Sequence, residues 1–277
     1  MTLRERNLLF KFGIALTALA LCCLAFASVS VFRIHSGVFS SLMDSASERG
    51  GVIGSYFGPV WDYAAFVSMT VSTVYALTAL IFIYRFFEKT KAPEILFFAF
   101  FVMSFAFEAC RIMIPLKEVN ELPSVYLIMS GRLLFFGRYF GLFSLFMASV
   151  YAAGFNVQQQ KNNILALTAL SFVFALDIPL DGFSWNSSLS IANGYPRLFG
   201  MAELGFTLVT LTTFFVAALT RGSKDYIFVG LGALAVLIGR EVLVNADTWV
   251  APFASLLLLS LGTWFICTRL HSVYLWF

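Results

Sequence analysis

Apolar runs of about 20 residues recur along the whole chain, and they constrain its fold more than any other feature. A run of this length can cross the hydrocarbon core of a bilayer as one α-helix, which satisfies its own backbone hydrogen bonds. The composition agrees, because only 12% of the 277 residues are charged, against about 25% in a typical soluble domain. The sequence therefore predicts an all-α integral membrane protein, with residues 1–277 forming a single polytopic transmembrane domain.

Prolines and turn residues divide this apolar sequence into eight predicted helices. Pro93, Pro123 and Pro196 each mark the start of an apolar run, and the segment TRGSKD separates the sixth run from the seventh. The predicted transmembrane helices are 8–32, 62–87, 94–115, 124–154, 164–180, 197–219, 225–244 and 250–270. Two connecting segments, 33–61 and 181–196, are long enough to be more than simple connectors.

Basic residues in the short connections predict the orientation of the bundle. If the N-terminus is cytoplasmic, the cytoplasmic side receives Arg4, Arg6, Lys11, Arg85, Lys89, Lys91, Lys161, Arg221, Lys224 and Arg269. The opposite side then receives only Arg33, Arg49 and Lys117 outside the helices. The positive-inside rule predicts an N-in and C-in topology, with 33–61 and 181–196 as non-cytoplasmic loops. We expect a cell membrane location, with the bacterial cytoplasmic membrane, a cell inner membrane, favoured.

The N-terminal segment admits an alternative. Residues 1–27 have a basic start, an apolar stretch and an Ala25-Phe26-Ala27 sequence that fits a signal-peptidase site. Cleavage there would leave seven transmembrane helices. A retained first helix is favoured because the apolar run continues through SVSVF and reaches full membrane length.

The cysteines and histidines indicate no metal or cofactor site. The four cysteines all lie within apolar runs and show no CxxC or Cys/His spacing. The predicted membrane helices contain no histidine, which argues against histidine-ligated haem and HExxH zinc chemistry. The formal charge of +3 includes no basic tract, so nucleic acid is not an expected partner.

A layer of ionisable residues in the outer half of the predicted helices is the main lead to function. At about 1.5 Å rise per residue, five helices contribute to it. The layer consists of Arg111, Arg132, Arg138, Arg240, Glu108, Asp177, Glu203 and Glu241. One charged residue at mid-bilayer costs roughly 2.5–3.5 kcal/mol, so we expect these groups to turn inward, pair or line a wetted cavity.

Two pairs in this layer have different expected geometries. Glu108 and Arg111 are three residues apart, share one helix face and can pair directly. Arg240 and Glu241 are adjacent in sequence and point in different directions from a helix, so both are expected to need partners on other helices.

The charged layer has two competing interpretations. In the first, arginines and acids satisfy each other and lock the bundle. In the second, they form a polar pocket that takes an anionic or zwitterionic group, because guanidinium matches carboxylate and phosphate in shape and charge. The second interpretation assigns the four arginines as anion contacts and the four acids as the groups that orient them, with no catalytic residue.

Small residues predict one close helix contact. Gly137 and Gly141 form a GxxxG motif in 124–154, and 225–244 carries small residues at Gly232, Ala235 and Gly239. Such faces let helix backbones approach closely. We therefore expect these two helices to be neighbours.

The function predicted from these features is non-catalytic. The chain is expected to bind a membrane lipid headgroup or a small anion, as a sensor or as a subunit of a membrane complex with a partner membrane subunit or a cytoplasmic signalling protein. One alternative is a small-solute or lipid transporter, which paired charges and Pro179 favour. Another is an intramembrane lipid- or peptide-modifying enzyme using Glu108 and Arg111, although histidines are missing. A purely structural subunit is the fourth class.

Overall fold

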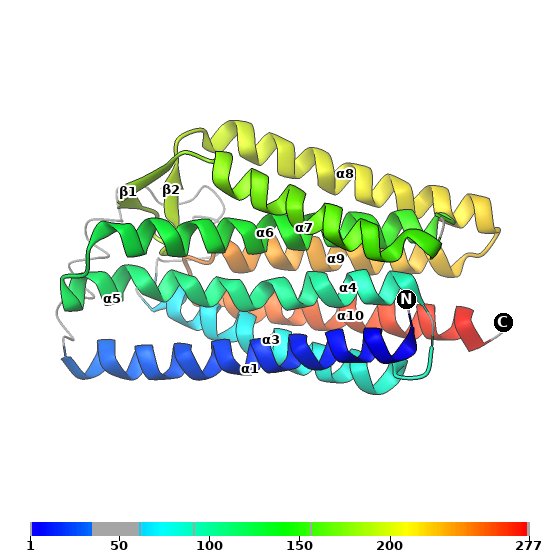
Figure 1. The fold of residues 1–277 in the computed structure, drawn as a ribbon, viewed down its shortest axis with the longest axis horizontal. Coiled ribbons are helices and arrows are strands. Elements are labelled where there is room, and N and C mark those ends of the chain that lie inside the picture. Colours follow the sequence, from blue (N-terminus) through cyan, green and yellow to red (C-terminus); the bar gives the residue numbers. More distant parts are fainter. Residues whose placement is uncertain (1, 35–60, 62, 91, 156, 276–277) are drawn as a thin grey trace.

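In the computed structural model, the protein is a bundle of long helices that run side by side (Figure 1). The structure describes residues 2–34, 61, 63–90, 92–155 and 157–275. The long helices are α1 (Leu3–Ile34), α3 (Ala64–Phe87), α4 (Pro93–Ser104), α6 (Ser124–Ala152), α7 (Gln160–Asp177), α8 (Pro196–Arg221), α9 (Asp225–Val244) and α10 (Val250–Leu275). Shorter elements are η3 (Phe105–Ile112), α5 (Met113–Asn120), η4 (Val157–Gln159), β1 (Leu180–Trp185) and β2 (Ile191–Asn193).

The two ends of the bundle differ in what they carry. The strands β1 and β2 lie at one end, and the labelled N- and C-termini both lie at the other (Figure 1). We call these the hairpin end and the terminal end. Most of the predicted loop 33–61 lies outside the described residues.

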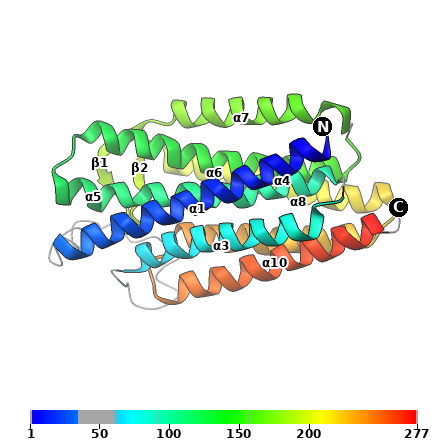
Figure 2. The ribbon, with the colours of Figure 1, turned by 60° about the horizontal axis from the view of Figure 1, so that its bottom comes forward.

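Among the described residues, seven helical stretches are long and apolar enough to cross a membrane. They are Leu3–Phe32, Ala64–Phe87, Pro93–Asn120, Ser124–Ala152, Pro196–Arg221, Asp225–Val244 and Val250–Tyr274. The predicted all-α membrane bundle is thus confirmed at this level. The remaining long helix, α7, runs along the outside of the bundle (Figure 2). Its polar first turn and terminal Asp177 leave only 164–176 as apolar sequence, so an eighth crossing stays a prediction, as does the orientation.

The third predicted helix, 94–115, is longer and less regular than expected. A 3-10 segment, η3, joins α4 to α5, and helical structure continues to Asn120. A 3-10 run of 8 residues is unusually long. Pro115 contributes to it, because proline lacks an N–H and its ring clashes with the carbonyl four residues earlier, that of Arg111. Likewise, α10 extends past the predicted end at 270, so His271 is helical.

The predicted loop 181–196 contains an antiparallel hairpin of β1 and β2. Its tip, residues 186–190, turns into the bundle: Leu189 is fully buried and has a positive φ of 52°. Ile191 packs against Gly131 of α6, where any larger side chain would clash with it. The hairpin therefore closes its end of the bundle rather than projecting from it.

The predicted contact between 124–154 and 225–244 is wrong as a small-residue interface. On α6, Gly137 faces Phe107 of η3 and Gly141 faces Ser104 of α4. On α9, Gly232 faces Gly262 and Ile266 of α10. Each glycine face thus packs against a helix other than the predicted one. A helix face made of small residues allows a close approach but does not determine which helix approaches it.

Candidate functional site

Glu108 lies at the centre of a buried ionic cluster near the hairpin end. Arg138 of α6 donates two hydrogen bonds to its carboxylate, from Nε to Oε1 at 2.8 Å and from Nη2 to Oε2 at 3.0 Å. Arg111 Nη1 lies 3.3 Å from Glu108 Oε2. Because residues three apart eclipse each other in a 3-10 helix, η3 aligns Glu108 with Arg111 along one face. Both guanidiniums are buried, so one carboxylate serves two buried cations.

The hairpin tip supplies the remaining partners of these arginines. Arg111 Nη2 donates to the carbonyl of Ser188, and Arg138 Nη1 donates to Ser190 Oγ at 3.2 Å. From α3, Ser68 Oγ accepts a further bond from Arg111 at 3.3 Å. These acceptors are uncharged. The small void beside Arg111 and Leu189 has no room for a water molecule, so the tip seals the cluster.

Arg240 and Glu241 join the same cluster from α9. Contrary to the sequence prediction, the two pair with each other: Arg240 Nη1 lies 2.7 Å from Glu241 Oε1. Their long side chains bend toward each other although their Cβ atoms diverge. Arg240 Nη2 also donates to the carbonyl of Arg138 at 3.3 Å. We call Glu108, Arg111, Arg138, Arg240 and Glu241 the Glu108 cluster.

The other three predicted residues have different positions. Glu203 of α8 is partly buried and lies within electrostatic reach of Arg240 and Arg138. Arg132 lies apart from the cluster and donates to the carbonyls of Ala175 and Leu176 at the end of α7, where helix carbonyls lack intrahelical partners. Asp177 is exposed. The structure thus gathers five of the eight residues, places Glu203 beside them and separates Arg132 and Asp177.

Asp247 was not predicted as a site residue. It is buried in the connection between α9 and α10 and accepts a hydrogen bond from Ser187 Oγ at 2.9 Å. It also lies within electrostatic reach of Arg111. Asp247 therefore holds the hairpin tip over the cluster. In the sequence it lies between the predicted helices 225–244 and 250–270, where no periodic pattern distinguishes a buried acid from a solvated one.

Glu94, at the terminal end, is a second unpredicted buried carboxylate. It is 1% exposed, accepts a hydrogen bond from Tyr274 Oη at 2.6 Å and lies 3.8 Å from Arg221 Nη2. In the sequence it resembles an ordinary acid in the first turn of a helix, directly after Pro93, where the helix dipole favours a negative charge. Its burial follows from packing against α8 and α10, which no local pattern predicts.

Two arginines of the Glu108 cluster, Arg111 and Arg138, donate hydrogen bonds to neutral groups of the hairpin tip. Arg111 Nε is buried and has no hydrogen-bond partner among the described residues.

Across the described part of the chain, no group of three or more His, Cys, Asp or Glu side chains could hold a metal ion. Comparisons with protein family models, curated proteins and solved structures found no match to this chain.

Proposed function

We propose that the protein is a non-catalytic membrane protein that binds an anionic or zwitterionic ligand, either a lipid headgroup or a small anion, at the Glu108 cluster. It would act as a sensor or as a subunit of a membrane complex. One observation carries the proposal: Arg111 and Arg138 are buried, share the carboxylate of Glu108, and each donates a further hydrogen bond to an uncharged atom of the hairpin tip. Under the predicted topology, this tip faces the non-cytoplasmic side.

An anion can replace those uncharged acceptors favourably. Guanidinium is permanently charged and binds carboxylate or phosphate in a planar, two-pronged geometry. Hydrogen bonds between charged partners are roughly twice as strong as neutral ones. An anion that displaces the Ser188 carbonyl and the Ser190 hydroxyl would therefore bind more strongly than the groups it replaces, and the free Arg111 Nε offers one more donor.

Binding of this kind would also move the hairpin. The tip fills the space that the ligand needs, so the ligand selects a conformation in which the tip is withdrawn. A ligand shifts such an equilibrium only by its difference in affinity for the two states. Here that difference comes from the arginine contacts, which only the open state offers to a ligand. Tip displacement would be the signal that a partner subunit or a cytoplasmic signalling protein receives through helix packing.

Transport is the second candidate, because Glu94 places a buried carboxylate at the terminal end as well. Alternating access needs polar groups that connect the two ends. Between Glu94 and Glu108, α4 and η3 present buried aromatic side chains instead, namely Phe97, Phe98, Phe101 and Phe105. This packed aromatic layer favours binding at one end over passage through the bundle.

The variant Arg111→Gln tests the proposal. It should disturb the fold little, because the two hydrogen bonds between Glu108 and Arg138 stay intact. The protein is reconstituted in nanodiscs of phosphatidylcholine with or without phosphatidylglycerol, and separately titrated with inorganic phosphate. We expect anion-dependent thermal stabilisation of the wild type. One charged hydrogen bond contributes about 1.5–3 kcal/mol, so Arg111→Gln should weaken binding roughly ten- to a hundredfold.

The matched control is Arg269→Gln, which removes an arginine from a partly exposed pair with Asp225. This variant should keep the wild-type response. If phosphatidylglycerol acts and phosphate does not, the ligand is a lipid headgroup, and the reverse identifies a free anion. A folded Arg111→Gln protein with an undiminished response would contradict the proposal, and so would a wild type that responds to neither anion.

A further inference from the structure

The hairpin tip is held in the bundle by polar contacts of two kinds. Contacts of the first kind go to the arginines of the Glu108 cluster, through the carbonyl of Ser188 and the hydroxyl of Ser190. The second kind goes to a residue outside the cluster, because Ser187 Oγ donates to Asp247 Oδ1 at 2.9 Å. This bond between Ser187 and Asp247 therefore holds the tip without using any of the arginine donors that an anion would need.

Asp247 is well placed to anchor the tip. It lies in the connection between α9 and α10, and the backbone N–H of Trp61, shortly before α3, donates to its carbonyl at 2.9 Å. Asp247 and Ser187 are both buried. A hydrogen bond to a carboxylate is charge-assisted and stronger than a neutral one. The bond from Ser187 thus ties the tip to a point where α3, α9 and α10 meet.

The closed tip also contains a backbone conformation that favours release. Leu189 has a φ of 52°, in the left-handed region, where the Cβ atom crowds the following carbonyl oxygen. Such a conformation persists only where surrounding contacts compensate for its strain. Here these contacts are the burial of the Leu189 side chain and the hydrogen bonds of the three serines. The loss of one of these bonds should shift the tip toward a withdrawn state.

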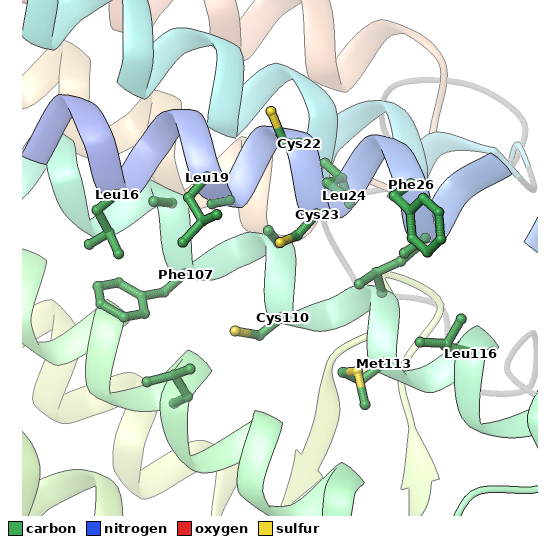
Figure 3. Close-up of a pocket in the computed structure, with 16 residues that line it drawn as sticks. Leu16, Leu19, Cys22, Cys23, Leu24, Phe26, Phe107, Cys110, Met113 and Leu116 are labelled. Atoms are coloured by element: carbon green, nitrogen blue, oxygen red, sulfur yellow. The ribbon is translucent and has the colours of Figure 1, made fainter. Parts of the chain in front are cut away.

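The opposite side of η3 does not offer an anion a comparable approach. Cys110 and Met113 line an apolar groove between η3–α5 and α1 (Figure 3), and no charged residue contributes to its lining. On the hairpin side, the void beside Arg111 and Leu189 has no room for a water molecule. An anion that arrives from the hairpin end therefore has to displace the tip to reach Arg111.

We propose that the hairpin tip is an autoinhibitory strap over the anion site, and that the hydrogen bond between Ser187 and Asp247 is its latch. This inference rests on the proposed anion binding and specifies how that binding is regulated. The apparent affinity for the anion is the intrinsic affinity multiplied by the fraction of molecules in which the tip is withdrawn. A movement of the α9–α10 connection that breaks the latch would raise this fraction and increase the affinity.

The variant Ser187→Ala tests the latch, because it removes the hydrogen bond to Asp247 without changing any charge near the arginines. Hydrogen–deuterium exchange at the tip is measured by mass spectrometry on the full protein in nanodiscs, without added anion. In the closed tip, the N–H of Leu189 donates to the carbonyl of Asn186 at 2.8 Å, so opening of the tip permits its exchange. Loss of one hydrogen bond to a charged group should accelerate this exchange roughly ten- to a hundredfold.

The matched control is Ser149→Ala on α6, which changes a buried serine whose hydroxyl donates within its own helix, to the carbonyl of Phe146. This variant should leave exchange at the tip unchanged. Titration with inorganic phosphate, and with phosphatidylglycerol in the nanodisc, then measures the effect on binding. Ser187→Ala should bind the anion more tightly than the wild type, by up to the same factor as the change in exchange. A variant that only damaged the site would bind more weakly.

Two results would overturn the inference: unchanged exchange at the tip of a folded Ser187→Ala protein, or faster exchange without tighter binding. A wild type that responds to neither anion would contradict the proposed function and the regulation with it. The exchange measured without anion would still show whether Ser187 holds the tip, so the two failures are distinguishable. If Ser187→Ala does not fold, the wild type decides. Saturating anion should speed exchange at its tip, because binding requires withdrawal, and unchanged or slower exchange would overturn the inference.

Discussion

At the scale of single residues, burial rather than distance determines how much an ion pair affects the stability of the protein. The Glu108–Arg138 pair has an N–O distance of 2.8 Å, and the Lys161–Glu5 pair has 2.7 Å. The first is buried, whereas both side chains of the second are largely exposed. Exposed pairs contribute little because water screens them. A buried charge that loses its partner costs about 3–5 kcal/mol.

Glu108→Gln should therefore be among the most destabilising single substitutions in this chain. It leaves Arg111 and Arg138 buried without their shared carboxylate, and we expect a loss of about 3–5 kcal/mol. The double variant Glu108→Gln/Arg138→Gln should lose less than Glu108→Gln alone, because it removes one stranded guanidinium and the two sites are coupled. Unfolding in mixed detergent micelles with increasing sodium dodecyl sulfate measures both effects.

The control for this experiment is Glu5→Gln, which breaks the exposed pair with Lys161 and should barely shift the unfolding midpoint. Equal midpoints for wild type and Glu108→Gln would show that the cluster carries no stabilising charge pairing. A double variant as unstable as the sum of its parts would show that Glu108 and Arg138 act independently.

The residue-scale predictions succeeded where the determining contact is local. Glu108 and Arg111 pair because they are three residues apart on one helix. The partner of Arg138 could not be predicted, because it lies 30 residues away on another helix. Arg240 and Glu241 diverge at the backbone, yet their long side chains meet. The spacing of two residues on a helix fixes the directions of their Cβ atoms. It does not decide whether their side chains meet, because long side chains such as those of Arg240 and Glu241 can bend toward each other.

At the scale of elements, α6 depends on its glycines for contact with the composite helix α4–η3–α5. A Cβ at Gly137 would overlap Phe107, the η3 residue directly before Glu108. The close approach permitted by Gly137 and Gly141 brings Arg138 within reach of Glu108. Packing at this interface thus sets the geometry of the charged site.

Gly137→Ala should consequently destabilise the protein, although alanine is the better helix former by about 1 kcal/mol. Overpacking costs about 1–3 kcal/mol, and it outweighs the gain in helix propensity because Phe107 Cβ cannot swing away. Gly205→Ala on α8 is the matched control, since no atom lies within 4 Å of its added Cβ. It should be neutral or slightly stabilising. Thermal unfolding of both variants in one detergent provides the comparison, and a Gly137→Ala protein as stable as Gly205→Ala would contradict this packing argument.

Element boundaries were predictable where apolar runs and prolines define them. The structure begins α4 at Pro93 and α8 at Pro196, close to the predicted starts. The 3-10 character of η3 was not predictable, because apolar periodicity alone does not separate 3-10 from α geometry. The hairpin was missed for a different reason: its serine-rich tip is buried by hydrogen bonds to Arg111, Arg138 and Asp247, and a polar tip resembles a solvated loop in the sequence.

At the scale of the whole molecule, positive charge concentrates at the terminal end. Arg85 and Arg221 lie in the last turns of α3 and α8, and Lys161 lies in the first turn of α7. Arg6 joins α1 to this end by donating to the carbonyls of Phe87 and Glu88 at 2.7 and 2.9 Å. This charge asymmetry favours a cytoplasmic terminal end.

The topology can be measured on the full chain by cysteine accessibility. In a variant whose four native cysteines are replaced by serine, Glu121→Cys lies at the hairpin end after α5, and Lys224→Cys lies at the terminal end before α9. Both positions are exposed. A membrane-impermeant maleimide should label Glu121→Cys in intact cells and Lys224→Cys only after permeabilisation. The intact mass of the unsubstituted chain should equal the full 30.8 kDa, because its first apolar run reaches full membrane length and is expected to be retained rather than cleaved after Ala27. The opposite labelling pattern would place the Glu108 cluster beneath the cytoplasmic surface, so its ligand would have to come from inside the cell.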